Sequence, residues 1–149
     1  MTPRDLEAYF HEHIPLTRAM QVSVVSVDSE SIVVAAPLAP NINHRATVFG
    51  GSAATLATLA AWAIVHTRLI DAGQSSRLVI QRNTMSFDQP ISGDFTARGV
   101  IADPAAWITF MRLLERKGKA RITATSELLF EGAVVARFEG EFVALREPA

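Results

Sequence analysis

The sequence predicts an α+β fold in which one curled antiparallel β-sheet wraps around a long central α-helix. Nearly every position from Ala53 to Val65 is apolar, and the exceptions are the small hydroxyl residues Thr55 and Thr58. A surface helix shows one apolar stripe and one polar face, so a helix that is apolar all round has to be covered on most sides. Six further segments have strand patterns, and all their connections except the central one look short, which favours antiparallel neighbours. A single sheet that curls around the helix would cover it.

The predicted elements alternate between helices and pairs of strands. In order, we expect a helix over residues 2–14, strands over 20–28 and 31–37, the long helix over about 51–71, strands over 77–87 and 95–102, a helix over 103–117, and strands over 119–130 and 133–145.

Local signals define the elements of the N-terminal half. Thr2 is placed to cap the first helix and Pro3 to open it, and Ile14-Pro15 ends it. Asp28-Ser29-Glu30 is the turn between the first two strands. A loop then leads into the long helix, which Gly73 stops.

Turn and capping residues also define the C-terminal half. Residues 88–94 (DQPISGD) form a turn between two strands, Asp103-Pro104 starts the second helix, and Lys117-Gly118 closes it. The apolar face of that helix is expected to be Trp107, Phe110, Met111 and Leu114. The last two strands form a hairpin across Glu131-Gly132, and the last one alternates apolar and polar residues, so one of its faces is covered.

Length and composition limit the possible functions. The 149 residues contain no repeat or linker and predict one domain over residues 1–149. A net charge of -1 argues against a nucleic-acid binder, which needs a clustered basic surface. The absence of cysteine excludes disulfides, thiolate catalysis and cysteine-based metal sites.

No targeting or membrane segment is predicted. Residues 1–10 lack the apolar run of a signal peptide, so a cytoplasmic location is expected. The apolar part of the long helix is shorter than the ~20 residues that span a bilayer, and His66 and Arg68 follow it closely. We therefore expect a helix buried in protein and no membrane partner.

Two motifs resemble those of a known family. Residues 43–51, with the pattern Asn-x-x-Ala-x-x-Phe-Gly-Gly, resemble the Asn-x-x-Gly-x-x-His-Gly-Gly signature that opens the central helix of hotdog-fold acyl-CoA thioesterases. Residues 86–99 resemble the second recurring stretch of that superfamily, an aromatic and a proline followed by Gly-Asp and a strand. The run FGGSAATLATLAAW is most similar to the YiiD C-terminal domain branch. The resemblance covers nearly the whole chain and implies a hotdog fold, with two departures: Ala46 replaces the usual glycine and Phe49 the usual histidine.

The resemblance implies that Gly50 and Gly51 serve thioester hydrolysis. Negative charge develops on the carbonyl oxygen during this reaction, and a helix N-terminus offers unpaired N–H groups at the positive end of its dipole. Glycines would let a thioester approach these groups closely, and the N–H of Gly50 is the expected donor of an oxyanion hole. The alternative is that the two glycines only let the loop enter the helix without a clash.

The attacking water needs a second group, which we expect to be Asn43 together with Thr58. Many relatives carry an aspartate or glutamate two turns after the glycines, where this chain has Thr58. A threonine hydroxyl can hold a water but is a poor base, and it could instead bond back to a carbonyl one turn earlier. Because no acid occurs between Glu30 and Asp71, a base could come from His44 or from a second subunit.

The substrate site implied by the resemblance is a tunnel for pantetheine and an acyl chain. Phe49, Gly51 and Trp62 are its expected lining, with Trp107 a further candidate, and Phe49 makes the entrance suit an aliphatic acyl group. The resemblance also implies a homodimer or a dimer of dimers, with each site completed by Asn83 and Ser86 from the partner's strand. No cofactor is expected, because coenzyme A is part of the substrate.

Other site motifs fail on spacing. In GGSAA, Ala54 occupies the second glycine position of a nucleophile elbow, so Ser52 is not expected to be a nucleophile. His11 and His13 are two residues apart on a helix, which makes a poor metal pair, and no metal site is predicted. His66 is expected to be a favourable partner of the C-terminus of the long helix.

Two alternatives to hydrolysis stay open. A noncatalytic acyl-CoA-binding or regulatory hotdog protein is favoured by the missing carboxylate. An acyl-thioester dehydratase or hydratase is less favoured, because those relatives use a histidine and acid pair that is not evident here.

Residues 112–121 carry five basic side chains against Glu115 alone. The basic residues are Arg112, Arg116, Lys117, Lys119 and Arg121. Such a patch would favour the phosphates of coenzyme A, or it is an ordinary solvated helix end, and its position on the fold decides between the two.

Overall fold

The elements follow the predicted order, with one additional helix. The computed structural model describes residues 1–148. Its elements are α1 (Pro3–His13), α2 (Pro15–Ala19), β1 (Ser23–Val27), β2 (Ser31–Ala36), the 3-10 turn η1 (Ala39–Asn41), α3 (Gly50–Asp71), β3 (Ser76–Phe87), β4 (Phe95–Val100), α4 (Pro104–Lys117), β5 (Lys119–Phe130) and β6 (Ala133–Arg146). The sequence prediction missed α2, because Pro15 not only ends α1 but also stands at the first position of the next helix.

The predicted helix caps are confirmed. Thr2 and Asp5 form a reciprocal capping box at the start of α1, and the Asp103 side chain accepts a hydrogen bond from the N–H of Ala105 at the start of α4. Gly118 ends α4 in the left-handed conformation, with a φ of 71°.

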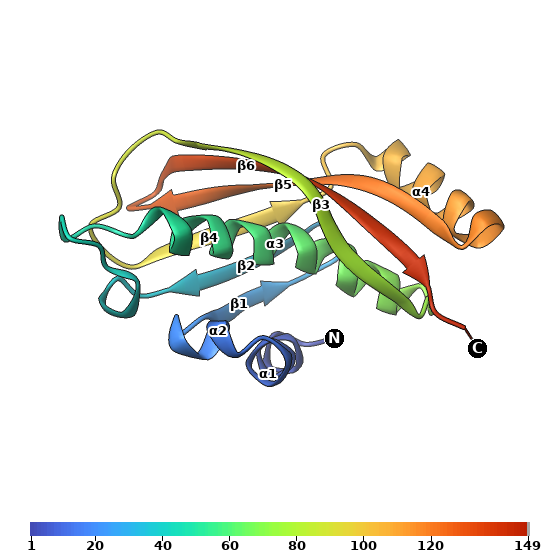
Figure 1. The fold of residues 1–149 in the computed structure, drawn as a ribbon, viewed down its shortest axis with the longest axis horizontal. Coiled ribbons are helices and arrows are strands. Elements are labelled where there is room, and N and C mark those ends of the chain that lie inside the picture. Colours follow the sequence, from blue (N-terminus) through green and yellow to red (C-terminus); the bar gives the residue numbers. More distant parts are fainter. Residues whose placement is uncertain (149) are drawn as a thin grey trace.

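The six strands form one antiparallel sheet in the order β1-β2-β4-β5-β6-β3. Figure 1 shows this sheet curling around α3, so the predicted hotdog fold is confirmed. The expectation that β3 and β4 are neighbours is wrong: β3 pairs with β6 and β4 pairs with β2 and β5. Residues 88–94 therefore do not form a tight turn, but carry the chain from one edge of the sheet past the ends of β6 and β5.

The long helix α3 is the core of the fold. Eleven of its 22 residues are buried, and it packs against β2, β4, β5, β6 and β3. Gly99 of β4 lies against the helix backbone, since a Cβ there would overlap the carbonyl oxygen of Ala60. The Ser126 hydroxyl donates a hydrogen bond of 2.8 Å to the carbonyl of Ala57. By length and composition alone the whole helix could cross a membrane, but its burial identifies it as a core helix, as the sequence predicted.

The other helices lie at the margins of the sheet (Figure 1). Helix α1 packs on β1 and on the aromatic side chain of Trp62 in α3. Helix α4 packs along β5, and its predicted apolar face is confirmed by the full burial of Phe110 and Leu114. In β6 the predicted alternation is also confirmed, since Ala136, Phe138, Gly140, Phe142 and Ala144 are all buried.

Candidate active site at the start of the central helix

Helix α3 begins with backbone N–H groups that have no partner. Its N-cap, Phe49, provides no side-chain acceptor, and within residues 1–148 no acceptor meets the N–H of Gly50, Gly51 or Ser52. The loop before it is held in place, because the N–H of Phe49 donates to the carbonyl of Asn41 at 2.8 Å. The helix therefore presents free donors and the positive end of its dipole at a fixed position.

A cavity of about 290 Å³ lies beside Gly50. Its lining residues are Val48, Gly50, Ala53, Phe87, Asp88, Gln89, Pro90, Ile91 and Ala136. A Cβ on Gly50 would stand 3.8 Å from Cε1 of Phe87, so this aromatic ring faces the start of the helix. The sequence prediction did not assign Phe87 to the site, although Phe87 is the aromatic residue of the motif in residues 86–99. The cavity is thus mainly apolar and adjoins an unpaired N–H donor.

Gly51 has a different environment. A Cβ at this position would overlap the ring of Phe49, which is itself 57% exposed. The missing side chain of Gly51 therefore makes room for Phe49, a reason that the sequence did not indicate. Phe49 and Gly51 also line a second cavity of about 410 Å³ between α2 and α3, together with Leu16, Met20 and Thr55.

Asn43 organises the loop that precedes the helix. Its Oδ1 accepts hydrogen bonds from the N–H groups of Arg45 and Thr47, at 2.8 and 3.2 Å, and its Nδ2 donates to Thr47 Oγ1 at 2.9 Å. Within this turn Ala46 has a φ of 62°, in the left-handed region that favours glycine. Ala46, which replaces the glycine of the family signature, therefore has the backbone conformation that glycine favours. The polar atoms of Asn43 form hydrogen bonds within the loop.

Thr58 is half-buried on α3, and its hydroxyl donates to the carbonyl of Ala54 at 2.7 Å. The Thr58 hydroxyl therefore makes the bond to a carbonyl one turn earlier that the sequence left open as an alternative. Its oxygen can still accept a hydrogen bond. Thr58 follows Gly50 by eight residues, a rise of about 12 Å along an α-helix. Gly50 and Thr58 of one chain therefore cannot both contact the same thioester carbonyl.

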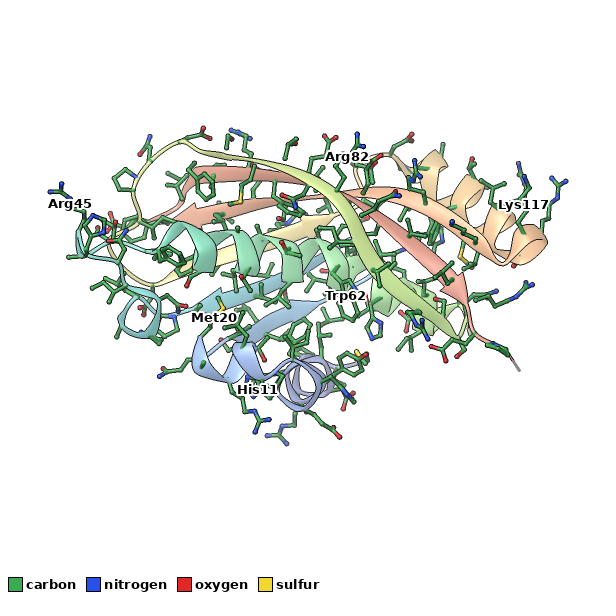
Figure 2. All side chains as sticks on the ribbon, in the orientation of Figure 1. His11, Met20, Arg45, Trp62, Arg82 and Lys117 are labelled. Carbon is green, nitrogen blue, oxygen red and sulfur yellow. The ribbon has the colours of Figure 1, made fainter. Side chains whose placement is uncertain are left out.

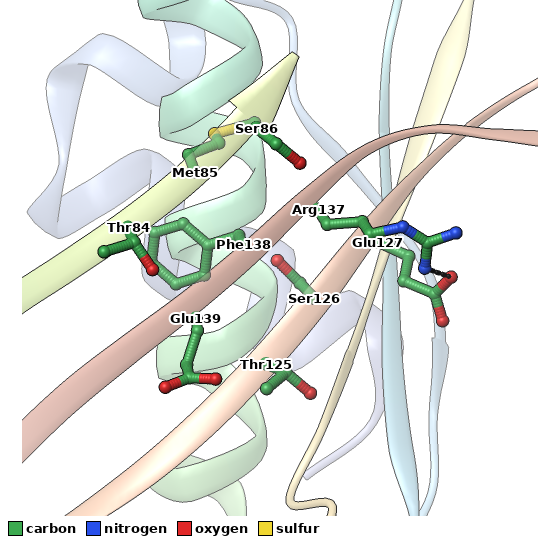
Figure 3. Close-up of a pocket in the computed structure, with 9 residues that line it drawn as sticks. All are labelled: Thr84, Met85, Ser86, Thr125, Ser126, Glu127, Arg137, Phe138 and Glu139. Atoms are coloured by element: carbon green, nitrogen blue, oxygen red, sulfur yellow. Dashed lines mark hydrogen bonds and ion pairs between the residues drawn. The ribbon is translucent and has the colours of Figure 1, made fainter. Parts of the chain in front are cut away.

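Asn83 and Ser86 of β3 lie on opposite faces of the sheet. Asn83 is paired with Gly140, on the face that α3 covers, and Ser86 is paired with Arg137, on the outer face. Ser86 borders an outer groove of about 460 Å³, where Arg137 donates to Glu127 at 3.3 Å (Figure 3). Of the two, only Asn83 shares a face with the central helix.

Trp62 and His66 belong to an aromatic cluster with Tyr9 of α1. The Trp62 and His66 rings stack at 4.3 Å, and Tyr9 lies 4.9 Å from His66. Burial lowers the pKa of His66 to about 4, so the ring is neutral at pH 7. The expectation that His66 is a favourable charged partner of the helix C-terminus is therefore wrong, and Arg68 is the basic residue of the last turn.

The remaining candidate residues lie away from the cavity beside Gly50. Trp107 contacts Arg68, whose guanidinium carbon stands 4.3 Å above the indole ring. His11 donates from Nε2 to the carbonyl of Val22, and His13 lies against Tyr9. His44 is exposed in the loop that Asn43 organises.

Comparison with known proteins identifies the relatives of this chain. Residues 3–146 match the family model described as "Putative thioesterase (yiiD_Cterm)". A Chlorobaculum tepidum protein described as of unknown function is 28% identical, with 98% of each chain covered and a TM-score of 0.91. A Shewanella oneidensis structure described as a "putative thioesterase" is 26% identical, with 96% of each chain covered and a TM-score of 0.86. The Escherichia coli PaaI protein of the phenylacetic acid degradation operon, 17% identical over 99% of this chain and 94% of its own, shares the fold at a TM-score of 0.70.

Proposed function

The chain belongs to the family described as "Putative thioesterase (yiiD_Cterm)", and we propose from this premise that it hydrolyses acyl-CoA thioesters. Water adds to the thioester carbonyl, the carbon–sulfur bond breaks, and the products are a carboxylate, the free thiol of coenzyme A and one proton. The observation that carries the proposal is the unpaired N–H of Gly50 beside a mainly apolar cavity of about 290 Å³. A donor fixed there stabilises the oxyanion, and studied oxyanion-hole donors are worth ~2.7–4 kcal/mol each.

The proposed site is built from two protomers. Thr58 lies about 12 Å along the helix from Gly50, so the water that attacks a carbonyl at Gly50 needs a group from elsewhere. Strand β3 supports a second copy as the source: it is 12 residues long, pairs within residues 1–148 only with β6, and carries no lysine or proline. Such an open edge favours pairing with another strand, and antiparallel pairing of two β3 strands would bring Thr58 of the partner subunit toward the site.

The apolar lining supports an aliphatic acyl group. Val48, Ala53, Phe87 and Ile91 border the cavity at Gly50, and Phe49 stands exposed at the start of the helix. A polar aromatic hydroxyl that faces Val48, Ala53 or Ile91 would lose its hydrogen bonds to water, which costs free energy. We therefore expect kcat/KM to be higher for aliphatic acyl-CoA than for hydroxybenzoyl-CoA.

A noncatalytic acyl-CoA-binding protein is the second candidate. The observation that favours it is the state of Asn43, whose side chain bonds within its own loop, together with the absence of any acid between Glu30 and Asp71. In that case the free N–H groups of α3 would bind the thioester carbonyl without hydrolysis.

A hydrolysis screen separates the two candidates. Steady-state release of free thiol from acyl-CoA substrates of increasing chain length tests hydrolysis, and calorimetry with the same compounds tests binding. Turnover of at least one aliphatic substrate supports the thioesterase, whereas saturable binding without turnover across the series supports the binding protein. The variants Asn43→Ala and Thr58→Val test which residues hold the attacking water. A loss of kcat with little change in KM would assign this role to the residue replaced.

A further inference from the structure

Half of the 14 basic residues of the chain gather at one end of the molecule, where Figure 2 labels Lys117. They are Arg77, Arg112, Arg116, Lys117, Lys119, Arg121 and Arg146, and all seven are exposed. The same segments, residues 76–77, 112–121 and 145–147, contain only two acids, Glu115 and Glu147. In a chain with a net charge of -1, this basic end is a local surplus of positive charge.

The fold joins segments that are far apart in the sequence into this basic end. Arg77 of β3 and Lys119 of β5 are both paired with Leu145 of β6, so they flank it on either side. Arg146 has a structural role, since its Nη1 donates to the carbonyls of Leu114 and Glu115 at the end of α4. The other six side chains make no hydrogen bond or ion pair with any residue between 1 and 148. Their charge is therefore free for a ligand.

Strand β3 links the basic end to the cavity at Gly50. Its first residues lie at the basic end, and its last residue, Phe87, lies at the cavity, so the length of β3 separates the two in one chain. The carbonyl of Leu78 is already occupied by the indole Nε1 of Trp62 at 3.0 Å. The free stretch of the edge is therefore Val79 to Phe87, whose midpoint is Asn83.

Antiparallel pairing of two β3 strands about a two-fold axis at Asn83 would bring the basic end of one protomer toward the cavity of the other. Arg77 lies six residues before Asn83 and Gln89 six residues after it, so this register, continued past the end of β3, would bring Arg77 of the partner subunit toward Gln89. Gln89, two residues beyond the end of β3, lines the cavity at Gly50. In such a dimer the basic end of one protomer would lie near the cavity of the other.

We propose that the basic end of one protomer binds the phosphate groups of the coenzyme A whose thioester lies in the cavity of the other protomer. The inference rests on the proposed acyl-CoA function and on the β3-paired dimer. The nucleotide part of coenzyme A carries a diphosphate and a ribose phosphate, and Arg and Lys bind such oxygens through charge-assisted hydrogen bonds. Arg77 and Lys119 are the nearest groups, and Arg121 and the end of α4 extend the surface.

Calorimetry with coenzyme A and with pantetheine, which lacks every phosphate, tests this inference. The double variant Arg77→Gln/Lys119→Gln is expected to weaken coenzyme A binding at least tenfold at low salt and to leave pantetheine binding unchanged. The matched control is Arg4→Gln/Arg18→Gln, which removes two exposed arginines from α1 and α2 and is expected to bind like the wild type. Light scattering checks that all proteins have the same mass.

The outcomes separate this inference from the proposed function. Equal coenzyme A affinity in the double variant and the wild type would overturn the inference. A wild-type protein that binds pantetheine as tightly as coenzyme A would also overturn it, as would a wild-type protein that binds neither compound. If the inference is overturned, hydrolysis of acyl-pantetheine by the double variant at the wild-type rate would still support the thioesterase proposal. Loss of coenzyme A affinity in a protein that hydrolyses no thioester would support the inference and contradict hydrolysis.

Discussion

The indole Nε1 of Trp62 donates a hydrogen bond of 3.0 Å to the carbonyl oxygen of Leu78. This bond ties the second half of α3 to the first part of the open strand β3. It satisfies one backbone group on an edge strand and leaves the stretch from Val79 onward without such a partner. The central helix thus sets which part of β3 is open to a second chain.

We predict that Trp62→Phe lowers the free energy of unfolding by about 1 kcal/mol, because the ring stays in the aromatic cluster but the carbonyl of Leu78 loses its donor. The measurement is urea denaturation at a fixed protein concentration. Trp107→Phe makes the same ring change where no hydrogen bond of the indole is involved, and it is expected to cost less. Equal losses in the two variants would contradict a role for the bond.

Gly99→Ala is predicted to destabilise the fold by about 2 kcal/mol or more. Its Cβ would overlap the carbonyl oxygen of Ala60, a backbone atom of the core helix that cannot move aside alone. Gly50→Ala is the comparison, because a Cβ there meets only the Phe87 ring at 3.8 Å. Denaturation curves in which the two variants are equally stable would show that α3 and β4 do not pack as described.

The buried imidazole of His66 makes stability depend on pH. Its pKa is about 4 in the folded chain against 6.5 when exposed, so between these values the unfolded chain binds the additional proton. Stability is therefore complete above pH 6.5 and falls as the pH is lowered toward 4. The neighbours Tyr9 and Trp62 supply no charge that would compensate.

Melting temperatures between pH 7.5 and 4.5 measure this effect. His66→Phe keeps a flat ring against Trp62 and is expected to lose less stability over this range than the wild type. Carboxylates titrate in both proteins, so the difference between the two curves isolates His66. Parallel curves would mean that His66 is already solvated in the folded protein.

For the proposed dimer we predict a solution mass of twice 16.2 kDa. Asn83→Asp would place two carboxylates close to the two-fold axis, so the dissociation constant is expected to rise about tenfold at low salt and less at high salt. Gln74→Glu makes the same change of charge in the turn before β3 and is expected to stay dimeric. A wild-type monomer at micromolar concentration in light scattering would contradict the two-protomer site.

Much of the fold could be predicted because its signals are local. The capping box of Thr2, the left-handed Gly118 and the alternation along β6 each follow from residues a few positions apart. The pairing of β3 with β6 could not be predicted in this way, because it joins strands separated by β4, α4 and β5. The short connection between β3 and β4 predicted that they pair, but residues 88–94 carry the chain past the ends of β6 and β5 before β4 begins.

The candidate site was predictable only in part. The motif placed Gly50 at the start of α3, and the structure agrees. The contact of Phe87 with that position and the neutral state of His66 depend on tertiary packing, which no local pattern reports. The ring of Phe49 lies over Gly51, which is close to it in the sequence, but its position at the cavity between α2 and α3 depends on the tertiary fold.

The most direct test of the account is the replacement of Gly50 by proline, which removes the proposed oxyanion donor. Proline is well tolerated at the first position of a helix, and the preceding Phe49 already has a ψ of 134°, as a residue before proline requires. Gly50→Ala keeps the N–H and serves as the matched variant. With the best acyl-CoA substrate, we predict that kcat of Gly50→Pro falls about 100-fold or more, while Gly50→Ala stays within about tenfold of the wild type. A folded Gly50→Pro enzyme with the kcat of Gly50→Ala would contradict the assignment of the Gly50 N–H to the thioester carbonyl.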